Sequence, residues 1–173
     1  GCDRSYTVLG TGNFNEDTAG VFADHVLMTY NQEIGHDATE IFRFFRQSYQ
    51  KPRLMHLNIA PFDLRSFLRT RIEREIENQI AGMPAGISIK VNNFSDPETN
   101  LLIHRAADAG VPVRMIVRSM FSLVIEEGST IQAISIVDKY LEHSRMLIFE
   151  NGGEPEVFLA SADFMPRNFD TRV

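Results

Sequence analysis

The segment Gly86–Val117, with the sequence GISIKVNNFSDPETNLLIHRAADAGVPVRMIV, carries the strongest indication of a fold. It opens and closes with short runs rich in β-branched residues, 86–91 and 113–117, which have the length of strands. The residues between them have the spacing of an amphipathic helix. Because two strands joined through a helix pair in parallel by a right-handed crossover, the segment predicts a βαβ unit and an α/β fold.

Local signals mark the two ends of this helix. Ser95 is expected to cap its first turn, with Pro97 inside that turn and Glu98 three residues after Ser95. Gly110 is expected to end the helix near Ala109.

Polar residues follow both strands of the unit. Asn92 and Asn93 come directly after the first strand, and Arg118 comes directly after the second. Ligands of open α/β sheets bind beyond the carboxyl ends of the strands. The sequence therefore predicts a site at this edge of the sheet.

The rest of the chain alternates short apolar runs with amphipathic stretches. Asn151-Gly152-Gly153 predicts a hairpin turn that returns Asp163 toward the sheet end carrying His143. The polar break before Pro52 predicts a domain boundary near Lys51, because a residue preceding proline is disfavoured in a helix. Strands are predicted over 6–9, 26–29, 54–60, 131–137, 145–149 and 157–161, and helices over 37–47 and 63–80 with a stop at Gly82.

Composition narrows the functional class. The 173 residues carry a formal net charge of −6, which argues against a globally basic nucleic-acid binder and leaves room for a local basic site. A single cysteine, Cys2, excludes a disulfide-stapled module. No apolar run approaches the roughly 18 residues of a membrane span. The lack of an initiator Met favours a piece of a longer protein over a trimmed complete one.

A glycine-containing loop and the five histidines give little support to a dinucleotide site or a metal site. The loop Gly10–Asn15 lacks the last glycine of a dinucleotide-binding loop. The five histidines form no metal-ligand pair, so His104 is expected to be structural within its helix. His25 and His56 fall in strand-like runs, where an ordinary core or surface histidine is expected.

Several segments together resemble the polyphosphate kinase family, the type that works through a phosphohistidine and is built on phospholipase-D-like halves. The Leu-Glu-His-Ser-Arg stretch at 141–145 and the Ser-Ala-Asp-Phe-Met-Pro-Arg-Asn stretch at 161–168 are the most specific. The other matching segments are 9–16, 90–96, 109–118, 133–140 and 149–153, in family order along nearly the whole chain.

The resemblance implies a phospholipase-D-like mixed sheet flanked by helices, preceded by the tail of a similar domain. Residues 1–50 would be the end of the first catalytic domain and residues 51–173 the second catalytic domain. The implied reaction is reversible transfer of the terminal phosphoryl group of ATP to inorganic polyphosphate. The family's phosphorylated histidine would lie upstream of Gly1, so the isolated chain is expected to be inactive.

The resemblance also assigns residues. His143 matches the family's second active-site histidine, whose imidazole can move a proton near neutral pH. Arg145 takes the place of the second motif's basic residue, and ATP contacts are expected at Phe22, Arg118 and His143. Weaker expectations as phosphate-facing groups are Asn13, Lys90, Asn92, Arg145, Arg167 and Asn168.

The family further implies Mg²⁺, with its ligands upstream, so no residue here is assigned to a metal. ATP or ADP and polyphosphate would be the substrates of a homo-oligomer, with no nucleic-acid partner and no transmembrane segment. A cytoplasmic enzyme is expected, with peripheral association to the inner membrane face left open.

Departures from the family pattern keep two alternatives open. Gly20, Phe22 and Ala23 replace a basic residue, a tyrosine and a hydroxyl residue, and Ser119 and Phe121 replace a glycine and a cysteine. Phe22 can stack on a base without donating a hydrogen bond. The alternatives are a non-catalytic relative that binds polyphosphate or nucleotide, and a phospholipase-D-like phosphodiesterase.

Overall fold

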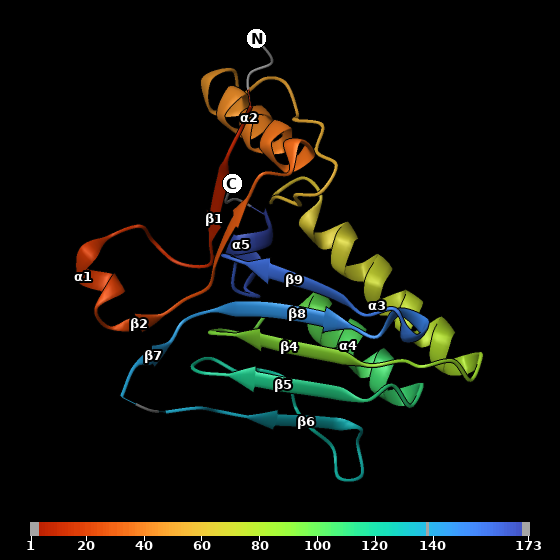
Figure 1. The fold of residues 1–173 in the computed structure, drawn as a ribbon. Coiled ribbons are helices and arrows are strands. Elements are labelled where there is room, and N and C mark those ends of the chain that lie inside the picture. The colour runs from red at the N-terminus through yellow and green to blue at the C-terminus, as the bar shows by residue number, and fades with distance from the viewer. Residues whose placement is uncertain (1–3, 138, 171–173) are drawn as a thin grey trace.

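A five-stranded mixed sheet forms the centre of the molecule (Figure 1). The computed structural model describes residues 4–137 and 139–170, so that Cys2 and Asp138 lie outside the described part. The strand order is β6-β5-β4-β8-β9. The strands are β4 (Ile87–Val91), β5 (Val113–Val117), β6 (Ile131–Ile134), β8 (Arg145–Phe149) and β9 (Glu156–Ala160).

The predicted βαβ unit is confirmed. β4 pairs in parallel with β5, placing Ile87 opposite Val113, and β5 pairs in parallel with β6. On its other side β4 pairs antiparallel with β8, which forms the predicted hairpin with β9 around Asn151–Gly153. The sheet therefore mixes parallel and antiparallel strands, and its edge strand β6 is shorter than the 131–137 predicted.

Two helices pack against the sheet, α3 (Leu64–Ile80) and α4 (Pro97–Asp108) (Figure 1). Both end at a glycine with positive φ, Gly82 at 71° and Gly110 at 87°, as predicted. Alternate residues of β4 are buried, which is the pattern of a strand with one face on the core. The largest fully buried side chains include Phe94, Phe149, Phe164, Phe169, Ile72 and Ile103.

The predicted cap of α4 is wrong by one residue. Asp96, not Ser95, occupies the cap position, and its Oδ2 accepts hydrogen bonds from the backbone N–H and the hydroxyl of Thr99. Asp96 also binds Arg65 of α3. Burial alone would raise the pKa of Asp96, but the hydrogen bonds from Arg65 and Thr99 hold it below its ordinary value. A carboxylate thus serves as both a cap and a tie between helices.

The first fifty residues form smaller elements beside the main sheet. β1 (Thr7–Gly10) and β3 (Val26–Thr29) make a two-stranded antiparallel sheet. β2 (Phe22–Ala23) pairs in parallel with β7 (Leu141–Glu142), which joins this part of the chain to the segment before β8. The helices are α1 (Glu16–Ala19), α2 (Gln32–Arg46) and, near the other end of the chain, α5 (Pro166–Asp170).

The predicted strand over 54–60 does not form. The carboxylate of Asp37, which is completely buried, accepts hydrogen bonds from the backbone N–H groups of Met55, His56 and Leu57 at 2.7–3.0 Å. Those N–H groups are therefore not available to a neighbouring strand. His56 lies in a loop, where its ring contacts Glu33. His25 likewise precedes β3 rather than lying in it.

The helix predicted from residue 37 begins five positions earlier, at Gln32. Asn31 caps it by accepting hydrogen bonds from the N–H groups of Glu33 and Ile34. Among residues 4–137 and 139–170, no helix is long and apolar enough to cross a membrane.

Candidate active site

His143 lies between β7 and β8, where two distant parts of the chain meet. The carbonyl oxygen of Ala23 accepts hydrogen bonds from the backbone N–H groups of both His143 (3.1 Å) and Ser144 (3.0 Å). These bonds extend the pairing of β2 with β7. The first fifty residues therefore fix the backbone at the histidine.

Asp24 holds the ring of His143. The Nδ1 atom lies 3.0 Å from Oδ1 and 3.1 Å from Oδ2 of Asp24. The hydroxyl of Thr11 donates to the same carboxylate at 2.7 Å. A Cβ at Gly12 would lie 2.1 Å from Oδ2 of Asp24, so only glycine leaves room for the carboxylate there. The predicted turn at Gly10–Asn13 therefore leaves the space beside Gly12 that the carboxylate of Asp24 occupies.

Arg145 fixes the other ring nitrogen. Its Nη1 lies 3.4 Å from Nε2 of His143 and also donates to the carbonyl oxygens of His143 and Thr11. Because a guanidinium can only donate, Nε2 acts as the acceptor and the ring proton lies on Nδ1, facing Asp24. The two partners assign one neutral tautomer to His143.

The carboxylate of Asp163 binds Arg145 and the two asparagines that follow β4. It accepts hydrogen bonds from Nε of Arg145 (2.9 Å), from the backbone N–H of Asn92 (3.0 Å) and from the side chain of Asn93 (2.9 Å). Burial alone would raise the pKa of Asp163, but the hydrogen bonds from Arg145 and Asn93 outweigh it and keep that pKa below its ordinary value. The hairpin β8–β9 does return Asp163 to this edge of the sheet, as predicted.

The polar residues predicted at the strand ends do meet. Nε of Arg118 donates to Oδ1 of Asn92 at 3.1 Å, and its backbone N–H donates to Val91 at the end of β4. Asn92 is 2% exposed, which leaves Arg118 as the more accessible of the two. A chain of hydrogen bonds thus runs from Arg118 through Asn92 and Asp163 to Arg145.

The other predicted site residues lie in different surroundings. The ring of Phe22 packs on His143, with the centroids 4.8 Å apart. Lys90 donates to Glu142 (2.5 Å) and Ser144 (2.6 Å), the two neighbours of His143 in sequence. Asn13 is exposed before α1, Arg167 is exposed on α5, and Asn168 is buried in α5; the described contacts link none of the three to the histidine ring.

The sequence did not identify Asp24. The available signal was weak: a carboxylate two residues after Phe22, to which the resemblance assigns an ATP contact. Nothing in the local pattern shows that residues 22–23 pair with 141–142, and that pairing is what brings Asp24 to His143.

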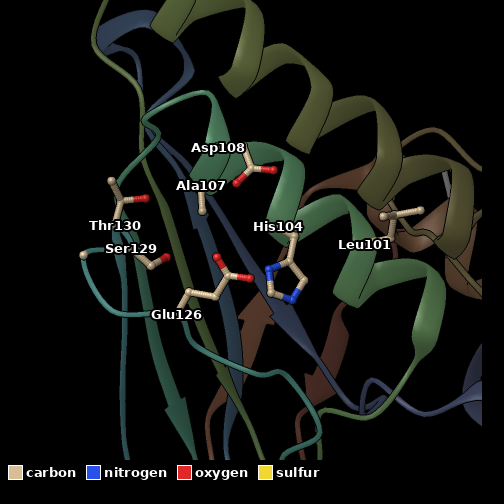
Figure 2. A pocket seen from close by; sticks show the side chains of 8 residues that line it. Leu101, His104, Ala107, Asp108, Glu126, Ser129 and Thr130 are labelled. Carbon is tan, nitrogen blue, oxygen red and sulfur yellow. The ribbon is translucent and has the colours of Figure 1, made fainter.

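A separate cavity of about 480 Å³ lies between α4 and the loop before β6 (Figure 2). Figure 2 shows the ring of His104 and the carboxylate of Glu126 on facing sides of it. None of its lining residues belongs to the arrangement around His143.

A histidine held at the edge of a mixed α/β sheet agrees with the phospholipase-D-like arrangement that the resemblance implies. Family models agree with this class. The model described as polyphosphate kinase C-terminal domain 1 matches residues 2–51, and that of C-terminal domain 2 matches residues 57–173. The chain belongs to the polyphosphate kinase family.

Individual relatives give the same result. The chain is 43% identical over 171 residues to polyphosphate kinase of Escherichia coli (strain K12) and 42% identical to that of Vibrio vulnificus (strain YJ016), with 97% of the chain covered in each case. The crystal structure of polyphosphate kinase from Porphyromonas gingivalis superposes with a TM-score of 0.92 at 38% identity over 99% of the chain. The chain spans only 24–27% of the length of these three proteins.

Proposed function

We propose that the enzyme containing this chain reversibly transfers the terminal phosphoryl group of ATP to inorganic polyphosphate. The family membership supports this reaction class. The observation that carries the proposal is the ring of His143, oriented by Asp24 on one nitrogen and by Arg145 on the other. Phosphoryl transfer depends mainly on positioning and charge stabilisation, and both are built into this arrangement.

In this proposal His143 moves a proton at the transferred phosphate. The carboxylate of Asp24 keeps the ring proton on Nδ1, so Nε2 carries the lone pair; this lone pair accepts from Arg145 here and can accept a proton once a phosphate oxygen takes that guanidinium donor. Asp24 then stabilises the imidazolium that forms, and Nε2 returns the proton in the reverse direction. Arg145 places a positive charge next to Nε2 of His143, and the proposed phosphate oxygen would lie beside both groups.

The nucleophile of the first step is proposed to lie outside this chain. A phosphohistidine intermediate divides the transfer into two displacements, so one site can serve both ATP and the polymer. We assign residues 1–50 to the end of the first catalytic domain and residues 51–173 to the second. The first part then supplies Asp24 and the second part supplies Arg145, the two partners of the His143 ring.

Nucleotide binding is proposed at Phe22 and Arg118. The face of Phe22 that does not contact His143 can stack on a base, although it offers no hydroxyl for a hydrogen bond. Arg118 keeps donors beyond its bond to Asn92 and can contact phosphate oxygens. Asn13, Arg167 and Asn168 are weaker proposals for the phosphate chain.

The family likeness implies Mg²⁺, and on that likeness we propose that its ligands lie upstream of this chain. Among residues 4–137 and 139–170, no group of three His, Cys, Asp or Glu side chains that could hold a metal ion is present. A homo-oligomeric, cytoplasmic enzyme is proposed on the family likeness alone.

The test is phosphoenzyme formation by the full-length enzyme with γ-labelled ATP, comparing wild type with His143→Ala. Acid-labile, base-stable label in both proteins, with polymer synthesis lost in the variant, supports His143 as the proton-transfer residue. Loss of label in the variant alone would instead make His143 essential to the first step. His36→Ala is the matched control, because His36 is exposed and outside the site.

Two results would contradict the proposal. No label in either protein, with ATP binding intact, would favour a non-catalytic binding relative, in line with the missing tyrosine hydroxyl at Phe22. Cleavage of a generic phosphodiester without polymer synthesis would favour a phosphodiesterase.

A further inference from the structure

Lys90 contacts both sequence neighbours of His143 and not the histidine ring. Its Nζ atom donates to Oε2 of Glu142 at 2.5 Å and to Oγ of Ser144 at 2.6 Å. The side chains of Lys90 and Glu142 are 20% and 29% exposed, so the ion pair is partly shielded from water. We call these two contacts the Lys90 clamp.

The residues of the Lys90 clamp differ from the residues that contact the ring of His143. The ring of His143 contacts Asp24, Phe22 and Arg145, and none of these contacts Lys90 among the described interactions. Glu142 and Ser144 both bind Nζ of Lys90, whereas the ring of His143 binds Asp24 and Arg145.

The buried neighbours support this separation. Ile89 and Val91 of β4 are buried on the face that packs on the helices, so Lys90 lies on the opposite face of the strand. Arg145 belongs to the buried set of β8, which is the helix-packed face. Lys90 and Arg145 thus reach the segment around His143 from different faces of the sheet.

We propose that Lys90 is a positioning residue for His143 rather than a ligand of the phosphate chain. This inference rests on the proposed function and differs from the expectation that Lys90 faces phosphate. An ammonium has three donors, and two of them are directed at Glu142 and Ser144. Only the third donor is left for a phosphate oxygen, and a polyphosphate bound there would lie beside the carboxylate of Glu142, whose negative charge would repel it.

Hydrogen bonds to the backbone hold the same segment around His143. Ala23 accepts the N–H groups of His143 and Ser144, while Lys90 binds the side chains on either side of the histidine. Removing Lys90 should loosen residues 141–146 even without substrate. A phosphate ligand, by contrast, would not affect the unliganded backbone.

The experiment uses the full-length enzyme with Lys90→Met and, in case that variant folds poorly, Glu142→Gln. Two quantities are measured: kcat and KM for polyphosphate, and hydrogen exchange of the peptide covering 141–146 without substrate. We expect kcat to fall by about tenfold or more, since small misplacements of a reacting group are costly. The KM for polyphosphate should stay within about twofold, and exchange should become faster.

Glu142→Gln should act in the same direction with a smaller effect, because glutamine keeps a hydrogen-bond acceptor without the charge. The double variant should lose no more than Lys90→Met alone, since Glu142→Gln acts on a contact that Lys90→Met already removes. Arg114→Met is the matched control: Arg114 is an exposed cation on the neighbouring strand β5. It should leave both quantities unchanged.

A higher KM for polyphosphate with unchanged kcat and unchanged exchange would overturn the inference and make Lys90 a phosphate ligand. No change in any quantity would also overturn it. If the wild-type enzyme makes no polyphosphate, the proposed function fails, while the exchange measurement still decides whether Lys90 orders the segment around His143.

Discussion

Nδ1 of His143 lies 3.0 Å from Oδ1 of Asp24, although 119 positions separate the two residues in the chain. Their side chains are only 16% and 20% exposed. The contact joins residues that match two different family models, one over 2–51 and one over 57–173. Each matched segment supplies one partner of the ring, Asp24 from the first and Arg145 from the second, and this makes the junction between them the most informative place to perturb.

Asp24→Asn should reduce polymer synthesis by about a hundredfold, the scale of a lost proton-transfer arrangement. An asparagine can turn its amide N–H toward Nδ1 and favour the wrong tautomer. Steady-state synthesis by the full-length enzyme measures the effect. Asp17→Asn, an exposed carboxylate in α1, should be neutral. Wild-type activity in Asp24→Asn would show that the carboxylate does not orient the ring.

Gly12→Ala should reproduce the loss seen for Asp24→Asn. The added methyl group would lie 2.1 Å from Oδ2 of Asp24, so the carboxylate must move away from His143. Gly20→Ala is the control, because its nearest neighbour would be a backbone oxygen at 3.9 Å. A crystal structure of the variant should show the bond between Asp24 and His143 broken. Full activity of Gly12→Ala would show that Gly12 is not needed to leave room for the carboxylate of Asp24.

Asp163→Asn should destabilise β8 by about 3 kcal/mol, because it leaves the guanidinium of Arg145 buried without its counter-charge. Arg145 is 7% exposed and Asp163 is 8% exposed. The free energy of opening of the β8 amides, from native-state hydrogen exchange, measures the loss. Asp108→Asn, at the exposed end of α4, should have little effect. An unchanged opening free energy would mean that the pair adds nothing to stability.

Asp37→Asn should loosen residues 52–63, measured as faster hydrogen exchange in that segment. Burial alone would raise the pKa of Asp37, but the N–H groups of His56, Leu57 and Met55 outweigh it and lower the pKa below its ordinary value. A lowered pKa gives stability that is present above the unfolded-state value of about 3.9 and is lost as the pH falls through the folded-state value.

The difference between wild type and Asp37→Asn should therefore be constant from about pH 7 to pH 5 and should shrink below about pH 4. The magnitude at neutral pH should be about 2–3 kcal/mol, as expected for charged hydrogen bonds to a buried carboxylate. A difference that grows toward acid would contradict the assignment of a lowered pKa to Asp37.

Much of the second part of the chain could be predicted because its signals are local. The strands β4 and β5, the long helix α3 and the hairpin turn at Asn151–Gly153 each follow from side-chain periodicity or turn residues within one segment. Asn92 and Arg118 could be placed at one edge because parallel strands end together. The exchange of Ser95 for Asp96 as a cap is a small error of the same local kind.

The failures have a common physical cause in long-range contacts. The run 54–60 has the composition of a strand, but a strand needs a partner, and the carboxylate of Asp37 takes its N–H groups instead. That competing contact leaves no pattern within residues 54–60 themselves.

Side-chain periodicity within single segments is enough to predict the α/β class and the parallel unit around α4, and the resemblance to the family is what singles out His143. The partners of the His143 ring become visible only in the folded chain. The short pairing of β2 with β7 brings Asp24 to Nδ1, and the hairpin β8–β9 brings Asp163 to Arg145. Hydrogen bonds between residues so far apart form only when the whole chain has packed, so no local pattern could encode them.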